Sequence, residues 1–283
     1  MSCLKIIDEV NFQNLTNGKS LPNSRIDFKN DDNLKIYLLI DSNYDHEINV
    51  AKGKYVKLFE IIDVNKGSLN LTINLEEDSN LEYISLRKGN ETNIHLSVNL
   101  RDRAVFNTKN INMFSNKVSF SEDINARGEN SEINSMDVVI NSSGEVQKFD
   151  IESLHYSSLS NCQMRNFVIN KNNSITHMNT NGFIEKGTKG VVINQKTKGL
   201  LLDLNSEISA NPLLCISEYD CNASHGASIG AINEEELYYL MSRGLTKESS
   251  ERLIVQGFIN PFVLGLDSDN LKQYIFDETN KIL

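Results

Sequence analysis

The sequence contains no tryptophan, only three prolines and no CxxC pair among its four cysteines. The missing CxxC pair argues against a zinc ribbon and against a thioredoxin-type dithiol. Its 38 acidic residues outnumber 28 basic ones, which gives a formal net charge of −10 at pH 7, and no basic stripe is present. Because nucleic acids and anionic membranes are recognised by clustered Lys and Arg, we expect neither as a partner.

The chain also lacks the hydrophobic segments of exported and membrane-spanning proteins. The N-terminal stretch MSCLKIIDEVNFQNL has no basic region followed by a long apolar run, so no signal peptide is visible. No apolar run approaches the ~20 residues that are needed to span a bilayer. We therefore expect a cytoplasmic protein whose cysteines are free thiols.

Short alternating segments dominate what is present. From Leu34 onward, runs such as LKIYLLID, YVKLFEIIDV and SLNLTINL follow one another, with β-branched or aromatic residues at alternate positions. Turn clusters such as KGNE and NSSGE separate the runs. So many similar strands with no helix between them predict a β-helix, an all-β solenoid of about seven to nine coils. Its core would span residues 34–232, after a short lead-in at residues 1–33.

The strand pattern ends at Asn233, where the sequence predicts a C-terminal helical region over residues 233–283. Asn233 is a good N-cap, three glutamates follow it, and Gly244 stands where the C′ residue of a helix is expected. Thr246 would cap a second helix, which the NPF at residues 260–262 is expected to interrupt. Because a solenoid needs covered ends, one interpretation of this region is a cap for the last coil.

Residues 209–258, SANPLLCISEYDCNASHGASIGAINEEELYYLMSRGLTKESSERLIVQGF, resemble the C-terminal signature of the SufB/SufD family. These proteins are the scaffold subunits of SUF iron–sulfur cluster assembly. The SHGA segment at residues 224–227, the acidic helix start with aromatics, the SRG turn and the later GF step carry the resemblance. The family fold is a right-handed parallel β-helix with helical terminal regions, in agreement with the strand pattern.

The resemblance implies a non-catalytic scaffold that pairs through its β-helix and docks the ATPase SufC on its C-terminal helices. The sequence has no GxxxxGK[ST] motif, so we expect ATP hydrolysis in that partner and no nucleotide bound by this chain. An iron–sulfur cluster would be bound only transiently. An alternative function is a carbohydrate-active β-helix lyase or hydrolase, although no carboxylate spacing demands an acid/base pair.

Of the two subunit types, the chain is more similar to SufD. SufB has a glutamate directly after the histidine of this segment, where this chain has Gly226. SufB also has a cysteine on a late strand, and the corresponding TKGLLLD at residues 197–203 has none. The long N-terminal helical domain of the family does not fit before Leu34, so we expect a short member. Pairing with a SufB-like chain and pairing with a second copy both remain open.

Three residues are candidate ligands of a cluster or metal: His225, Cys221 and Cys215. A neutral imidazole ligates iron, and iron–sulfur clusters prefer thiolates. On a straight strand Cys221 and His225 would face one way, about 13 Å apart, so they converge only through a bulge or turn or across a dimer interface. Cys215 is an even number of residues before both, so it would face the same way on a continuous strand. The structural alternatives are a hydrogen-bonded histidine at a turn and small buried cysteines.

The resemblance also implies either fold support or ATPase contact for six side chains of the helical region. The sequence does not separate these two roles. The six are Leu237, Tyr238, Met241, Arg243, Leu253 and Phe258.

Overall fold

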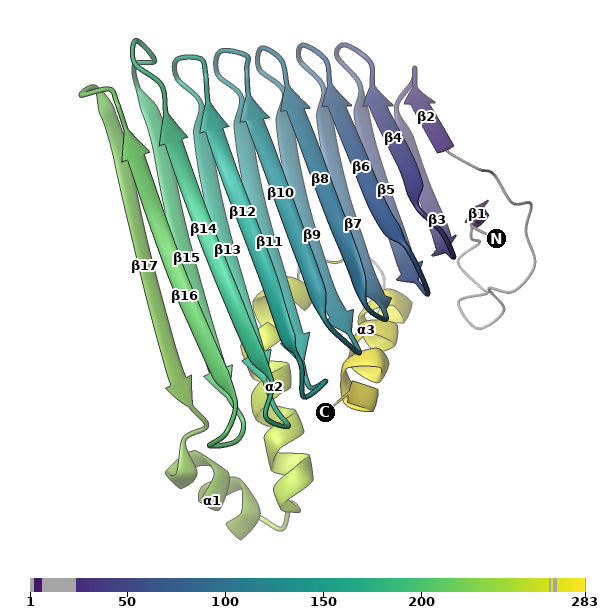
Figure 1. Ribbon diagram of the computed structural model, residues 1–283, viewed down its shortest axis with the longest axis vertical. Helices are drawn as coiled ribbons and strands as arrows, with labels where there is room; N and C mark the ends of the chain where they lie inside the picture. The colour runs from purple at the N-terminus through teal and green to yellow at the C-terminus, as the bar shows by residue number, and fades with distance from the viewer. Residues whose placement is uncertain (1–2, 7–23, 265, 267–268, 283) are drawn as a thin grey trace.

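The computed structural model describes residues 3–6, 24–264, 266 and 269–282, and in it the chain alternates between two long sheets (Figure 1). One sheet, here called the odd sheet, holds nine strands. They are β1 (Cys3–Ile6), β3 (Asp32–Ile40), β5 (Tyr55–Val64), β7 (Asn80–Gly89), β9 (Val105–Phe114), β11 (Glu132–Asn141), β13 (Asn161–Asn170), β15 (Val191–Leu201) and β17 (Cys221–Ala231).

The other sheet, here called the even sheet, holds eight strands. They are β2 (Ser24–Phe28), β4 (Tyr44–Val50), β6 (Ser68–Leu75), β8 (Thr92–Leu100), β10 (Val118–Ala126), β12 (Val146–His155), β14 (Ile175–Ile184) and β16 (Glu207–Ile216). β2 and the start of β3 precede Leu34, and residues 7–23 of the predicted lead-in lie outside the described residues.

Successive turns of the chain stack in parallel. Apart from β1, which runs antiparallel to β3, the described strands pair in parallel within both sheets. Tyr55 pairs with Asn80, and Asn161 pairs with Val192, so a turn takes 25 residues near one end and 31 near the other. The molecule is a parallel β-solenoid of roughly seven turns, as the alternating pattern predicts.

The alternation places every second residue in the space between the two sheets, and the register stacks like residues on one another. One row of the even sheet stacks Ile48, Ile73 and Val98, all with no exposed surface. Burying each such side chain contributes roughly 1.5–3 kcal/mol, which explains why the strands follow the two-residue period.

Asparagines form ladders along the outer face of the even sheet. The Asn74 amide donates to Oδ1 of Asn49 at 2.9 Å, and the Asn99 amide donates to Oδ1 of Asn74 at 3.0 Å. Many asparagines of this sequence therefore lie on strands, where their side chains bond along the stack as well as at the turns.

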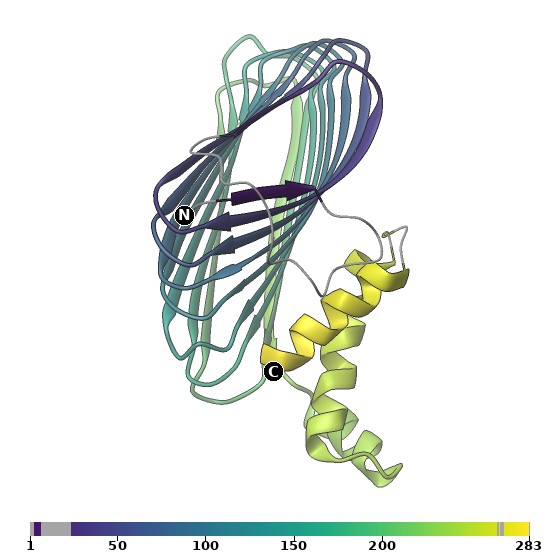
Figure 2. The ribbon, with the colours of Figure 1, turned by 90° about the vertical axis from the view of Figure 1, so that its right-hand side faces the viewer.

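Three helices follow the last strand: α1 (Glu234–Ser242), α2 (Lys247–Val263) and α3 (Asp269–Ile282). α2 and α3 lie against the outer face of the odd sheet (Figure 2). Val255, Ile259 and Phe262 of α2 form a second apolar core with strand residues such as Ile111 and Val138. None of the described helices combines the length and apolar character needed to cross a membrane.

This packing overturns the interpretation of the helices as a cap for the last coil. Every residue of β17 except Cys221 and Ala223 is exposed, so the described helices leave this end of the solenoid open. The apolar outer face of the odd sheet offers a larger surface to bury, and α2 and α3 cover that surface instead.

The predicted helix starts are confirmed by hydrogen bonds. Oδ1 of Asn233 accepts from the backbone N–H of Glu235 at 2.9 Å, and Oγ1 of Thr246 accepts from that of Ser249 at 3.1 Å. Gly244 has a positive φ of 96°, as expected after a helix end.

The expected interruption at residues 260–262 is wrong, because α2 continues through Pro261 to Val263. Pro261 lies in the last turn, where its ring removes one backbone hydrogen bond near the helix end. Phe262 and Val263, which lie between the exposed Pro261 and Leu264, are buried, and their burial stabilises this turn against that loss.

Candidate functional site at the open end of the solenoid

β17 is the edge strand of the odd sheet. Among the described strands it pairs only with β15, so its other side presents unpaired backbone N–H and C=O groups. Its sequence, CNASHGASIGA, consists mostly of small residues that leave the strand flat on both faces. An exposed, flat edge of this kind is a template for pairing with another strand.

His225 lies in the middle of this edge strand. It is in register with Gln195 of β15, and Gln195 shares the inward-facing side of its strand with Ile193, a residue of the interior core. His225 therefore faces the interior side of the last coil. It is nevertheless exposed, and its imidazole makes no hydrogen bond to any residue that the structure describes. The ring nitrogens are therefore accessible at the open end.

The interior beside His225 is polar. Gln195 is only 1% exposed, and neither atom of its side-chain amide has a hydrogen-bond partner among the described residues. Two residues further along β15, Thr197 accepts from the Asn166 amide at 3.3 Å, and this amide also donates to Thr180 at 2.9 Å. Sequence reasoning missed Gln195. The two residues are separated in sequence by one coil length, and this spacing could have predicted that they stack.

Cys221 lies on the same strand and the same face as His225. It is in register with Val191, it packs partly against the interior core, and its thiol donates to the carbonyl of Glu218 at 3.3 Å. The pairing of β17 with β15 runs without a break from Cys221 to Ala231, so no bulge brings Cys221 and His225 together. Convergence of these two groups would need a second chain.

Cys215 is on the other sheet and on the outer face. It is exposed and in register with Phe183, whereas its neighbour Leu214 packs against the interior core. The turn at residues 217–220 carries the chain from β16 to β17. The alternation of inward-facing and outward-facing residues is therefore not continuous from Cys215 to Cys221. The structure does not bring Cys215 to the side that Cys221 and His225 share.

Cys162 lies deep in the interior with no exposed surface, and burial raises the pKa of its thiol to about 12. A protonated, buried thiol is a poor ligand and a poor nucleophile. No group of three or more His, Cys, Asp or Glu side chains among the described residues is arranged to hold a metal ion. Iron–sulfur clusters take about four ligands, more than the described residues bring together at any one place.

A helical arm, residues 234–254 of α1 and the first turns of α2, projects beyond the solenoid (Figure 2). Three of the predicted contact residues are exposed on it: Tyr238 at 75%, Met241 at 42% and Leu253 at 47%. Leu237 is half-buried. Such apolar surface on a projecting element is typical of a binding site for another protein.

The two remaining residues of that predicted set have partners within the chain. The Arg243 guanidinium lies 5.2 Å from the centre of the Tyr239 ring, and it donates to the Tyr239 hydroxyl at 3.2 Å. The Phe258 ring meets Phe167 of β13 edge to face at 5.5 Å. Phe258 therefore supports the fold by anchoring α2 to the odd sheet.

A pocket of about 400 Å³ separates α1 and α2 at the base of the arm. Leu240 comes from α1, Leu253 and Ile254 come from α2, and Leu200 comes from β15. Because this pocket joins the exposed face of the arm, it extends the apolar surface that a partner would meet.

A buried ionisable cluster lies further inside the solenoid. Asp137 accepts from Ser135 at 2.9 Å and from the Asn110 amide at 3.0 Å, and Arg87 donates to Oδ1 of Asn110 at 3.2 Å. Burial, and then repulsion by Asp137, raises the pKa of Glu122 to about 8. Sequence reasoning missed this cluster, although Ser85, Asn110 and Asp137 recur at the coil spacing.

The chain matches the family model described as "SUF system FeS cluster assembly, SufBD core domain" over residues 41–258. It is 33% identical to the iron–sulfur cluster assembly protein SufD of Bacillus subtilis over 138 residues, which cover 49% of this chain and 32% of that protein. It is 23% identical to SufD of Escherichia coli over 250 residues, covering 83% of this chain and 57% of that protein. A SufBD family protein of Pyrococcus horikoshii is 42% identical over 84 residues, covering 27% and 19% of the two chains. The matches thus span less than two thirds of each relative.

Proposed function

Because this chain belongs to the SufBD family of iron–sulfur cluster assembly proteins and is SufD-like, we propose that it is a non-catalytic scaffold subunit of a cytoplasmic SUF complex. In this complex it pairs with a SufB-like chain or with a second copy of itself, and it docks a SufC-type ATPase. The observation that carries the proposal is the open, unpaired edge of β17, which presents His225 beside a polar interior.

Pairing is supported by the geometry of the last coil. β16 and β17 end the even and odd sheets, and a partner's strands would continue both sheets and cover the open interior. Ile229, which is 40% exposed on the inward-facing side of β17, would become buried. This burial would add an apolar contribution to the backbone hydrogen bonds of the new strand pair.

The incomplete donor set of one chain supports a shared cluster site. His225 and Cys221 share one face of β17 but do not converge within the chain. A partner across the same edge would add its own donors, so the nascent cluster would be held as cargo between the two chains. The His225 imidazole is accessible and its ring nitrogens are free, which suits a ligand that must release the cluster again.

The helical arm supports the docking of an ATPase. Tyr238, Met241 and Leu253 expose apolar surface away from the solenoid, next to the pocket between α1 and α2. The sequence has no phosphate-binding GxxxxGK[ST] loop, so ATP hydrolysis is assigned to the partner. The carbohydrate-active alternative has no observation in its favour, and the family match argues against it.

The test is the solution mass of the chain, co-expressed anaerobically with the neighbouring ATPase and measured by light scattering. Two scaffold chains with two ATPases would support self-pairing, and a complex that requires a SufB-like protein would support the heterodimer. Ala227→Arg places a charge on the inward-facing side of β17 and should abolish pairing. Val146→Arg, at an exposed position where β12 begins, is the matched control that should pair normally. A chain that stays monomeric and binds no ATPase would contradict the proposal.

A further inference from the structure

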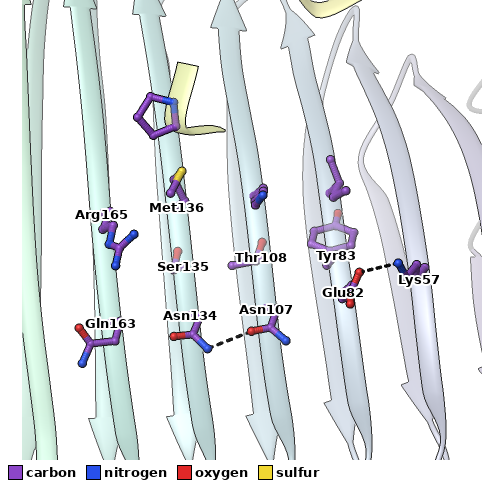
Figure 3. Close-up of a pocket in the computed structure, with 13 residues that line it drawn as sticks. Lys57, Glu82, Tyr83, Asn107, Thr108, Asn134, Ser135, Met136, Gln163 and Arg165 are labelled. Carbon is purple, nitrogen blue, oxygen red and sulfur yellow. Dashed lines mark hydrogen bonds and ion pairs between the residues drawn. The ribbon is translucent and has the colours of Figure 1, made fainter. Parts of the chain in front are cut away.

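A groove of about 590 Å³ lies on the outer face of the odd sheet, beside the last turn of α2 (Figure 3). Strands β5, β7, β9, β11 and β13 form its floor, so β15 separates it from the edge strand β17. Pro261 of α2 lies at its rim. Its volume is in the range that small-molecule sites occupy.

The register of the odd sheet arranges the floor in rows. One row is polar: Lys57 pairs with Glu82 at 3.2 Å, and the Asn134 amide donates to Oδ1 of Asn107 at 2.9 Å (Figure 3). The pairing of the strands aligns these four residues with Gln163. This row supplies fixed amide groups along one side of the groove.

The next row mixes apolar and cationic side chains. Ile84, Lys109, Met136 and Arg165 follow one another in register across four strands. The row beyond, which includes Val138, is covered by α2 as part of the second core. The helix therefore forms a wall of the groove, and it leaves the mixed row accessible.

The groove carries an excess of positive charge on a chain whose net charge is −10. Three of its lining residues are cationic, Lys57, Lys109 and Arg165, and Glu82 is the acidic one. The Glu82 carboxylate is already engaged by Lys57 and by the Tyr55 hydroxyl. The Arg165 guanidinium is exposed and has no hydrogen bond or ion pair with any described residue.

We propose that this groove binds a small organic anion, whose carboxylate or phosphate meets Arg165 and whose apolar body lies against Ile84, Met136 and Pro261. A guanidinium offers parallel N–H donors that match the oxygens of these two groups. Ile84, Met136 and Pro261 line the same groove as Arg165, and Met136 is its in-register neighbour, so a ligand with both parts is complementary to the site. This site is independent of the pairing and docking proposed above.

The first test compares two fluorescent probes of similar shape, the anionic 1-anilinonaphthalene-8-sulfonate and the uncharged N-phenyl-1-naphthylamine. Arg165→Gln should weaken saturable binding of the anionic probe about tenfold or more, since it removes a charged hydrogen bond. It should leave the uncharged probe unaffected. Arg101→Gln changes an exposed arginine on a turn outside the groove, so it should bind as the original chain does. Equal binding of the anionic probe by both variants would overturn the proposal.

Met136→Glu gives a second, independent variant. It places a carboxylate in register with Arg165, so an internal ion pair should displace the anionic probe. Displacement of the probe from the original chain by citrate would identify a carboxylate site, and displacement by pyrophosphate would identify a phosphate site. If neither competitor displaces the probe, the groove is not an anion site.

Discussion

Gln195 and His225 are in-register neighbours on the two last strands of the odd sheet, and both face the interior side of their coil. Gln195 is buried under β17, whereas His225 is exposed because no further strand follows it. The pair therefore marks the boundary between the closed interior of the solenoid and its open end.

This position predicts that His225→Ala loses iron and sulfide without losing stability. The imidazole has no partner among the described residues, so the free energy of unfolding should change by no more than about 0.5 kcal/mol. The iron and sulfide content of the anaerobically reconstituted complex should fall severalfold, because a ligand at the shared edge is removed.

Iron and sulfide assays on the purified complex check this prediction. His95→Ala is the matched control, since His95 is an exposed histidine on the even sheet, where Nδ1 contacts Ser121 at 2.9 Å. Unchanged iron and sulfide in His225→Ala would remove the histidine from the proposed cluster site.

Leu253→Asp should separate docking from folding. The side chain is 47% exposed on the helical arm, so a carboxylate there costs little in the isolated chain. In a docked complex the same carboxylate would be desolvated, which should weaken ATPase binding by roughly 30-fold or more. Leu264→Asp, at the other end of α2 and 72% exposed, should bind normally in the same co-purification and titration. Equal loss in both variants would argue against a docking role for the arm.

Phe258→Ala should act on stability. The ring packs edge to face on Phe167 at 5.5 Å and joins α2 to the odd sheet. Its removal should lower the free energy of unfolding by about 2 kcal/mol, measured by urea denaturation. Leu253→Ala, on the exposed arm, should lower it by less than about 1 kcal/mol. A Phe258→Ala chain as stable as the original would mean that α2 is held by its other contacts.

Glu122→Gln should change how stability depends on pH. Burial raises the pKa of Glu122 from 4.5 to about 8, so the folded chain keeps a proton that the unfolded chain releases. The protonated Glu122 therefore contributes to the free energy of unfolding. This contribution is fully present below about pH 4.5, and it is lost as pH rises through about 8. The original chain should therefore lose stability, on the order of a few kcal/mol, between about pH 5 and pH 9.

In Glu122→Gln this loss should be much smaller, because the amide has the same shape and no proton to release. A smaller slope should remain from Asp137, whose pKa burial also raises. Urea midpoints at the two pH values measure the difference, with Glu129→Gln as an exposed control. Parallel pH profiles for Glu122→Gln and the original chain would contradict a buried, protonated Glu122.

The sequence by itself determined the solenoid, its helix starts and its family. Inward-facing residues such as Ile73 must be buried at every second position, so the period of two shows directly in the residues. Caps such as Asn233 and Thr246 act on backbone groups two or three residues away, so local sequence predicts them. The signature at residues 209–258 is likewise contiguous, and the family match confirms it.

The tertiary structure alone decided which distant residues meet. Coil length differs along the chain, from 25 residues between β5 and β7 to 31 between β13 and β15, so the register that stacks His225 on Gln195 is set by the pairing of whole strands. The same stacking separates Cys215 from Cys221, buries Glu122, and leaves Arg165 open beside α2. α2 continues through Pro261 because the odd sheet offers its buried side an apolar surface. These outcomes depend on contacts between residues far apart in sequence, whose energies no short window contains.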